Sequence, residues 1–140
     1  MKRFFYFFLS ALVFLSCAST LYSLSPDVTV ERWAESLEGK DLDTLMTAYW
    51  PDAMLVIPGK DGMEQVWNGS AEIRELQSGS TENPDMEMVV MLDSSQRIMD
   101  GDSAIYILDV QSGGAVIINT LELEKRDNEW RIINQTLELK

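Results

Sequence analysis

The spacing of apolar residues changes near residue 80, and this change constrains the fold more than any other feature of the sequence. Before it, apolar residues recur every three or four positions, which is the period of an amphipathic helix. After it, apolar and polar residues alternate, as in half-buried strands, over residues 86–92, 103–111, 115–125 and 130–139. Short turn sequences rich in Gly, Asp and Asn join these four segments. Helices followed by an antiparallel meander predict an α+β domain.

The first part of the chain predicts three helical segments and one short strand. The helices are expected over residues 26–38, 42–50 and 71–78, with capping side chains at Ser25, Asp41 and Ser70. Pro26 stands in the first turn of the first predicted helix, and Pro51 stands directly after the second. The apolar run at residues 53–57 predicts a short buried strand, and residues 59–66 show no periodicity.

Residues 1–16 have the composition of a secretory signal peptide. Two basic residues precede the apolar run at residues 4–15, and small or polar residues follow it. The lone cysteine, Cys17, stands where the apolar run ends, and this arrangement resembles the lipobox of bacterial lipoproteins, in which the thiol receives diacylglycerol. We therefore predict a signal peptide, lipidation of Cys17, a tether at residues 17–25, and one domain over residues 26–140.

Two alternatives remain open for this leader. A signal peptidase that cuts near Ala18 or Ser23 would remove Cys17 and release the domain. An uncut leader would serve as an anchor, although its strictly apolar part is shorter than the roughly 20 residues that a membrane span needs. The lipid-anchored form places the domain in the cell envelope, on its periplasmic or outer surface.

Charge and composition exclude several classes of function. The chain has 23 acidic and 11 basic residues, for a net charge of −12, so phosphate backbones would repel it and nucleic acid is not an expected partner. It has no histidine and one cysteine, which excludes Ser-His-Asp and Cys-His catalysis and the common zinc sites. Its paired aspartates lack the spacing of an EF-hand loop. We predict no metal site and no cofactor.

Five short motifs resemble the NTF2-like superfamily, the cone-shaped α+β fold of SnoaL-type cyclases and ketosteroid isomerase. They are Val-Glu-Arg-Trp at 30–33, Gly-Lys-Asp-Leu-Asp at 39–43, Tyr-Trp-Pro-Asp-Ala at 49–53, Gly-Ser-Ala-Glu-Ile-Arg at 69–74, and Trp-Arg-Ile at 130–132. The resemblance covers the whole predicted domain. It implies three N-terminal helical segments packed on a curved, mainly antiparallel sheet. It also implies a homodimer formed through the open sheet face, where residues 116–118 offer an apolar surface.

The resemblance also implies which catalytic residues an isomerase of this kind would need. Its carboxylate base stands just before a proline, and the matching residue here is Ile57. Its oxyanion tyrosine corresponds to Trp33, and its second acid maps to Glu122 or Leu121. Dehydratase-type relatives use histidine, which is missing. The resemblance therefore favours a domain without the usual catalytic residues over the alternative, a SnoaL-like isomerase, hydrolase or cyclase with a rearranged site built on Glu122 or Asp52.

Aromatic, methionine and polar residues on the segments that line the cavity of this fold are the candidate pocket. They are Trp33, Tyr49, Met54, Trp67, Met88, Asn119 and Glu122. Small-molecule pockets are mostly apolar with a few polar groups, here Asn119 and Glu122, and methionine adapts to varied ligands. The competing interpretation is that the apolar members fill the core and that Glu122 faces solvent. The predicted function is binding of a small apolar ligand or a protein partner.

Overall fold

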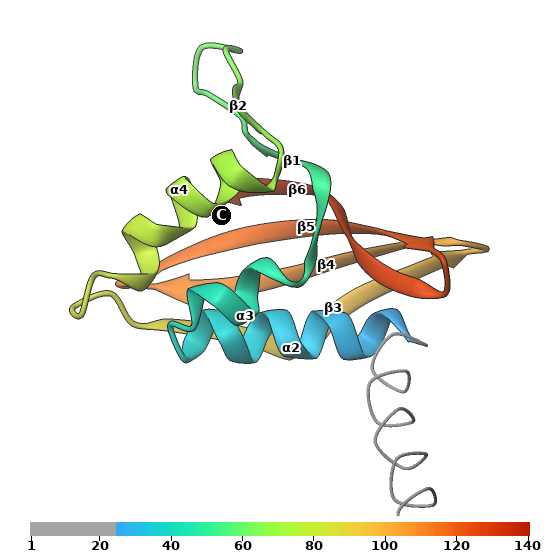
Figure 1. Ribbon diagram of the computed structural model, residues 1–140. Coiled ribbons are helices and arrows are strands. Elements are labelled where there is room, and N and C mark those ends of the chain that lie inside the picture. The colour runs from blue at the N-terminus through green and yellow to red at the C-terminus, as the bar shows by residue number, and fades with distance from the viewer. Residues whose placement is uncertain (1–24) are drawn as a thin grey trace, which may run out of the picture.

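The computed structural model describes residues 25–140, which form three helices and one six-stranded sheet (Figure 1). The helices are α2 (Pro26–Glu38), α3 (Leu42–Met46) and α4 (Ser70–Thr81). The strands are β1 (Tyr49–Ile57), β2 (Gln65–Asn68), β3 (Met88–Asp100), β4 (Ser103–Ser112), β5 (Ala115–Arg126) and β6 (Glu129–Leu139). Their order in the sheet is β2-β1-β6-β5-β4-β3, and every neighbouring pair is antiparallel except β1 with β6. The predicted α+β architecture is confirmed.

The last four strands form the predicted antiparallel meander. The β4–β5 turn has two glycines at positive φ, Gly113 at 55° and Gly114 at 84°. The β5–β6 turn places Asp127 and Asn128 at φ 50° and 62°, the left-handed pair that a tight two-residue hairpin requires. The first meander strand is longer than predicted, because β3 continues to Asp100 beyond an irregularity in its pairing with β4. Side chains stop alternating between the two faces at such a bulge, so the alternating pattern in the sequence predicts a strand that ends too early, at residue 92.

Helix α2 supplies most of the helical contribution to the core. It starts as predicted, with Ser25 Oγ accepting a hydrogen bond from the backbone N–H of Asp27 at 3.3 Å. The Thr29 hydroxyl donates to the backbone carbonyl of Trp130 at 2.8 Å, which joins the helix to β6. Trp33 is completely buried in the core, which also contains residues of the sheet and of the other two helices. We call the sheet face that carries this core the inner face and the opposite one the outer face.

The second helix is shorter, and the strand after it longer, than the sequence predicts. Helix α3 ends at Met46, and β1 already begins at Tyr49 and runs through Pro51. The β1–β6 register shifts between Tyr49 and Met54, so Pro51 lies in an irregular stretch where a missing N–H costs no ladder hydrogen bond. Tyr49 has the spacing of a helical core residue, but it reaches the core from a strand.

Two local features around α4 also differ from the prediction. The sequence pattern does not indicate β2, because its four residues are exposed or half-buried and show no alternation. Pairing with β1, including Leu55 opposite Trp67, holds it in place. At the start of α4, Gly69 occupies the capping position at φ 84°, and Ser70 is the first helical residue with no capping hydrogen bond.

The predicted signal peptide, the lipidation residue Cys17 and the tether lie outside the described residues, apart from Ser25. Within residues 25–140, no helix has the length and apolar character needed to cross a membrane.

Candidate functional site

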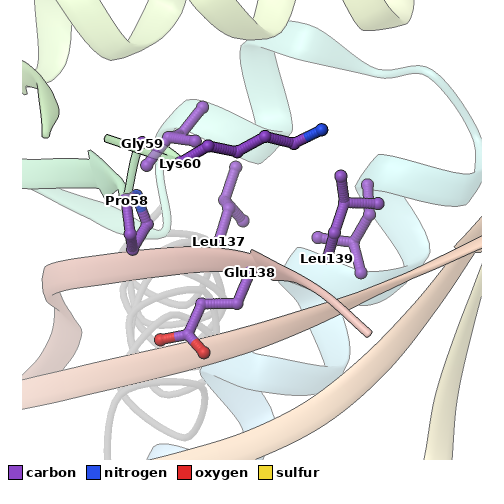
Figure 2. A pocket seen from close by; sticks show the side chains of 8 residues that line it. Pro58, Gly59, Lys60, Leu137, Glu138 and Leu139 are labelled. Atoms are coloured by element: carbon purple, nitrogen blue, oxygen red, sulfur yellow. The ribbon is translucent and has the colours of Figure 1, made fainter. Parts of the chain in front are cut away.

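A groove opens at the edge of the inner face where β1 and β6 end and β5 begins (Figure 2). Its volume is about 680 Å³, within the roughly 300–1,000 Å³ typical of small-molecule sites. The lining residues come from the three strands and from the loop after β1. They are Ile57, Pro58, Gly59, Lys60, Ile117, Leu137, Glu138 and Leu139.

Strand alternation makes the floor of this groove apolar. Leu137 and Leu139 are two residues apart on β6 and point to the same face of the sheet, where Figure 2 shows them projecting from one side of the strand. Ile117 lies directly opposite Leu139 in the β5–β6 register. Ile57 and Leu137 also pack against the core, whereas Leu139 is 75% exposed. No residue of α2, α3 or α4 lines the groove, and Leu139 is the one exposed member of the floor, since Ile57, Ile117 and Leu137 are half-buried.

The rim of the groove carries its two charged side chains, on opposite sides of β6. Figure 2 shows the Lys60 side chain lying across the groove above Leu137, while the Glu138 carboxylate lies beyond the strand. The loop that carries Lys60 turns tightly: the Gly62 N–H donates to the Gly59 carbonyl at 3.2 Å, and a Cβ at Gly59 would lie 2.0 Å from the Met63 carbonyl oxygen. Glycine is therefore required beside Lys60.

A chain of buried hydrogen bonds lies next to the floor. The Trp33 indole N–H donates to the Tyr49 hydroxyl at 2.9 Å, which donates to Gln135 Oε1 at 2.6 Å. Gln135 Nε2 then donates to Asn119 Oδ1 at 2.8 Å. Burial raises the pKa of Tyr49 above its usual value, so its hydroxyl stays a neutral donor. The chain ends beside the groove, because Asn119 lies opposite Leu137 in the sheet register.

Two solved structures show which known fold this arrangement matches. An NTF2-like protein of unknown function from Shewanella baltica superposes with a TM-score of 0.65 over 82% of this chain and 90% of its own, at 11% identity. A protein of unknown function with a cystatin-like fold from Nostoc punctiforme superposes with a TM-score of 0.63 over 80% and 86%, at 13% identity. The chain has the NTF2-like fold.

A third solved structure that superposes on this chain has the name of an enzyme. It is described as a putative aromatic ring hydroxylase from Novosphingobium aromaticivorans, and it superposes with a TM-score of 0.62 over 79% of this chain and 83% of its own, at 18% identity. No protein-family model matches the sequence, and comparison with curated proteins finds no relative.

The structure brings three of the predicted pocket residues together, but in the core of the NTF2-like fold. Trp33, Tyr49 and Asn119 are linked through the hydrogen-bond chain, and each is at most 3% exposed. Met88 and Trp67 are half-buried and pack against the core from β3 and β2. None of these five lines the groove. Trp33 and Tyr49, the two fully buried aromatic residues of this set, are instead part of the core.

The other two predicted pocket residues lie on the outer face. Glu122 is exposed and pairs across the sheet with Ile105 and Asn134, while its neighbours Leu121 and Leu123 are buried on the inner face. Strand alternation therefore directs the Glu122 carboxylate away from the core. Met54 is 37% exposed on the same outer face, one position out of phase with the buried Leu55.

Sequence reasoning missed Gln135 and most of the groove. Gln135 is only 1% exposed and joins two halves of the hydrogen-bond chain. A polar residue at an inward position of an alternating strand was the available signal. Ile57 does line the groove, at the position where the NTF2-like resemblance would put an isomerase base. An isoleucine there contributes apolar contact and no proton acceptor.

Asp52, the other acid considered for a rearranged catalytic site, forms an ion pair on the surface. Asp52 accepts two hydrogen bonds from Arg126 at 2.7 and 3.1 Å, which lowers the pKa of Asp52. Arg126 also stacks over Trp50, 5.0 Å from the ring centroid, so Asp52 belongs to a structural cluster. Among residues 25–140, no three His, Cys, Asp or Glu side chains gather closely enough to hold a metal ion.

Proposed function

We propose that this chain is an exported, lipid-anchored domain with the NTF2-like fold, which binds a small apolar ligand in the groove and lacks the usual catalytic residues. The observation that carries the proposal is the open apolar floor formed by Ile57, Ile117, Leu137 and Leu139. Apolar surface gathered in a concave site favours burial by a ligand. Each aliphatic side chain that a ligand covers contributes up to about 1.5–3 kcal/mol.

The enzyme alternative has less support from the positions of the acids. An enzyme with a rearranged site would use Glu122 or Asp52 as its proton acceptor. Glu122 is exposed on the outer face, and Asp52 is paired with Arg126 on the surface. Neither carboxylate lines the groove. A ligand on the apolar floor would therefore meet neither of these two acids.

A neutral apolar dye, N-phenyl-1-naphthylamine, tests the binding proposal with the full chain. Dye fluorescence is expected to rise on binding, and Leu139→Ser is expected to weaken the affinity about threefold or more, because it removes part of the floor. Met99→Ser is the matched control, since Met99 is also partly exposed (44%) but does not line the groove. Absence of dye binding, or equal loss in both variants, would overturn the proposal.

Export and anchoring rest on the leader sequence. The supporting features are the two basic residues, the apolar run and the position of Cys17. Intact mass spectrometry of protein from the host's membranes is expected to give residues 17–140 plus acyl chains. The Cys17→Ala variant is expected to lose that added mass. A mass that begins after Cys17, without acyl chains, would contradict lipid anchoring and indicate a released domain.

We also propose that a second copy of the chain packs on the outer face. Of residues 116–118, Ile117 belongs to the groove, and strand alternation directs Val116 and Ile118 to the outer face. Ile98 lies directly opposite Ile105 in the β3–β4 register and is 57% exposed. Pairing through this face would leave both grooves open. Sedimentation at micromolar concentration is expected to give a dimer mass, and a monomer mass would reject the pairing.

A further inference from the structure

We infer that the groove takes an anionic amphiphile with a single aliphatic chain, whose chain lies on the apolar floor and whose head group meets the Lys60 ammonium. This inference rests on the ligand-binding function proposed above and adds the chemical class and the orientation of the ligand.

Among the eight residues that line the groove, only Lys60 and Glu138 have polar side chains. The four floor side chains are isoleucine and leucine, which offer no hydrogen-bonding atom. The two charged lining residues are Lys60 and Glu138, and Figure 2 shows that the Glu138 carboxylate lies beyond β6 from the floor. Lys60 is therefore the one side chain that offers a ligand a charge on the floor's side of the strand.

The Lys60 ammonium is available for an external anion. Among residues 25–140, Arg74, Arg97, Arg126, Arg131 and Lys140 each form an ion pair with a carboxylate. Lys60 forms no ion pair in that part of the chain, although Asp61 and Glu64 stand nearby in the same loop. In a chain with 23 acidic and 11 basic residues, an uncommitted ammonium above an apolar floor favours a negatively charged head group.

The buried polar side chain beside the floor is already hydrogen-bonded within the protein. Asn119 lies opposite Leu137 in the β5–β6 register, beside the floor, and it is 3% exposed. Its Oδ1 accepts from Gln135, and its Nδ2 donates to the Ile117 carbonyl at 3.4 Å. A ligand with polar groups at both ends would have to bury one of them unpaired, at a cost. A chain that is polar at one end only fits this distribution.

Displacement of the bound dye from the full chain tests the inference. The competitors are dodecanoate and dodecyltrimethylammonium, which share a twelve-carbon chain and differ in head-group charge, both used below micelle-forming concentrations. Dodecanoate is expected to displace the dye at about two- to fivefold lower concentration, because an exposed charge pair contributes up to about a fivefold difference. The preference is expected to shrink as salt is raised.

Two variants, each of which removes one positive charge, distinguish the effect of Lys60 itself from the effect of the net charge. Lys60→Gln is expected to remove the preference for dodecanoate. Lys125→Gln, on β5 and outside the groove, is expected to keep it. Equal displacement by the two amphiphiles in the unmodified chain, or an unchanged preference in Lys60→Gln, would overturn the inference and leave the proposed function standing. Failure of the dye itself to bind would overturn both.

Discussion

Both ends of the inner sheet face carry large apolar side chains, but these are buried at one end and line a groove at the other. At the covered end, α2 places Trp33 over β1 and β6, and the inward residues there are at most a few per cent exposed. At the open end, Ile57, Ile117, Leu137 and Leu139 continue the same alternation on the same strands, and no helix residue lines the groove above them. Helix coverage, and not strand pattern, decides which inward residues become core and which become a ligand floor.

The two ends also differ in how they treat polar groups. At the covered end, the neutral polar side chains of Trp33, Tyr49, Gln135 and Asn119 are joined to one another by buried hydrogen bonds. The open end keeps its charged groups at the rim, where water reaches them. This difference predicts that substitutions at the covered end change stability and that those at the open end change ligand binding.

The largest effect is expected from Trp33→Ala at the covered end. The substitution leaves a cavity beneath α2 and removes the indole donor of Tyr49, so the free energy of unfolding should fall by about 3–5 kcal/mol. Urea denaturation of the full chain measures this. A loss below about 1 kcal/mol would show that the covered end is not tightly packed and would remove the contrast between the two ends.

A smaller effect is expected from Tyr49→Phe. The Trp33 indole N–H and Gln135 Oε1 each lose a buried partner, at a cost of about 2 kcal/mol. The loss should be the same at pH 7 and pH 4, because every side chain in the buried chain is neutral over that range and burial raises the pKa of Tyr49. A loss that changes over this range would contradict the assignment of neutral partners.

The loss of stability from Tyr106→Phe, unlike that from Tyr49→Phe, is expected to depend on pH, because Tyr106 contacts Asp27 at the start of α2. The Tyr106 hydroxyl donates to Asp27 Oδ1, and Arg97 pairs with Asp27 Oδ2 at 2.6 Å. The Tyr106 hydrogen bond and then Arg97 lower the pKa of Asp27 below its usual 3.8. A lowered carboxylate pKa contributes stability above the unfolded value and loses it as pH falls through the folded value. Tyr106→Phe should therefore cost about 1 kcal/mol at pH 7 and less below pH 4.

Urea denaturation at pH 7, 4 and 3 checks the Tyr106 prediction. Asp27→Asn is its control, because this variant has no carboxyl at that position and its response to Tyr106→Phe should not vary over the same range. A Tyr106→Phe cost that stays constant or rises as the pH falls would contradict the role assigned to Asp27.

The smallest change in stability is expected from Leu139→Ser at the open end. Leu139 is 75% exposed, so the free energy of unfolding should change by no more than about 0.5 kcal/mol. The same variant should still weaken dye binding. If its stability fell as far as that of Tyr49→Phe, Leu139 would belong to the core, and the distinction between floor and core would fail.

Much of the fold could be predicted from the sequence because its signals are local. The start of α2 at Ser25, the β5–β6 turn at Asp127 and the alternation of β4 each depend on neighbours in the chain. Tyr49 shows where local signals fail. Its spacing suits a helix, but hydrogen bonds to Trp33 and Gln135 and pairing with β6 hold it in a strand.

The candidate site was harder to predict because exposure depends on distant coverage. The resemblance to the NTF2-like fold implied that Trp33 and Tyr49 would line a cavity, but both side chains are buried in the core. Ile57 and Leu137 resemble ordinary core residues in the sequence, and they do pack against the core, but they also line the groove. The direction of Glu122 followed from alternation with Leu121 and Leu123, but its burial could not be decided without a settled strand register.

The parallel pairing of β1 with β6 also has a consequence for the timing of folding. Strand β6 lies between β1 and β5, so it alone joins the β1–β2 hairpin to the β3–β4–β5 part of the sheet. The sheet cannot close until residues 129–139 have been synthesised, and the contact between β1 and β6 spans most of the domain. Such long-range pairing slows folding. For a chain with the proposed export signal, late closure would keep the polypeptide unfolded while it passes through a translocation channel.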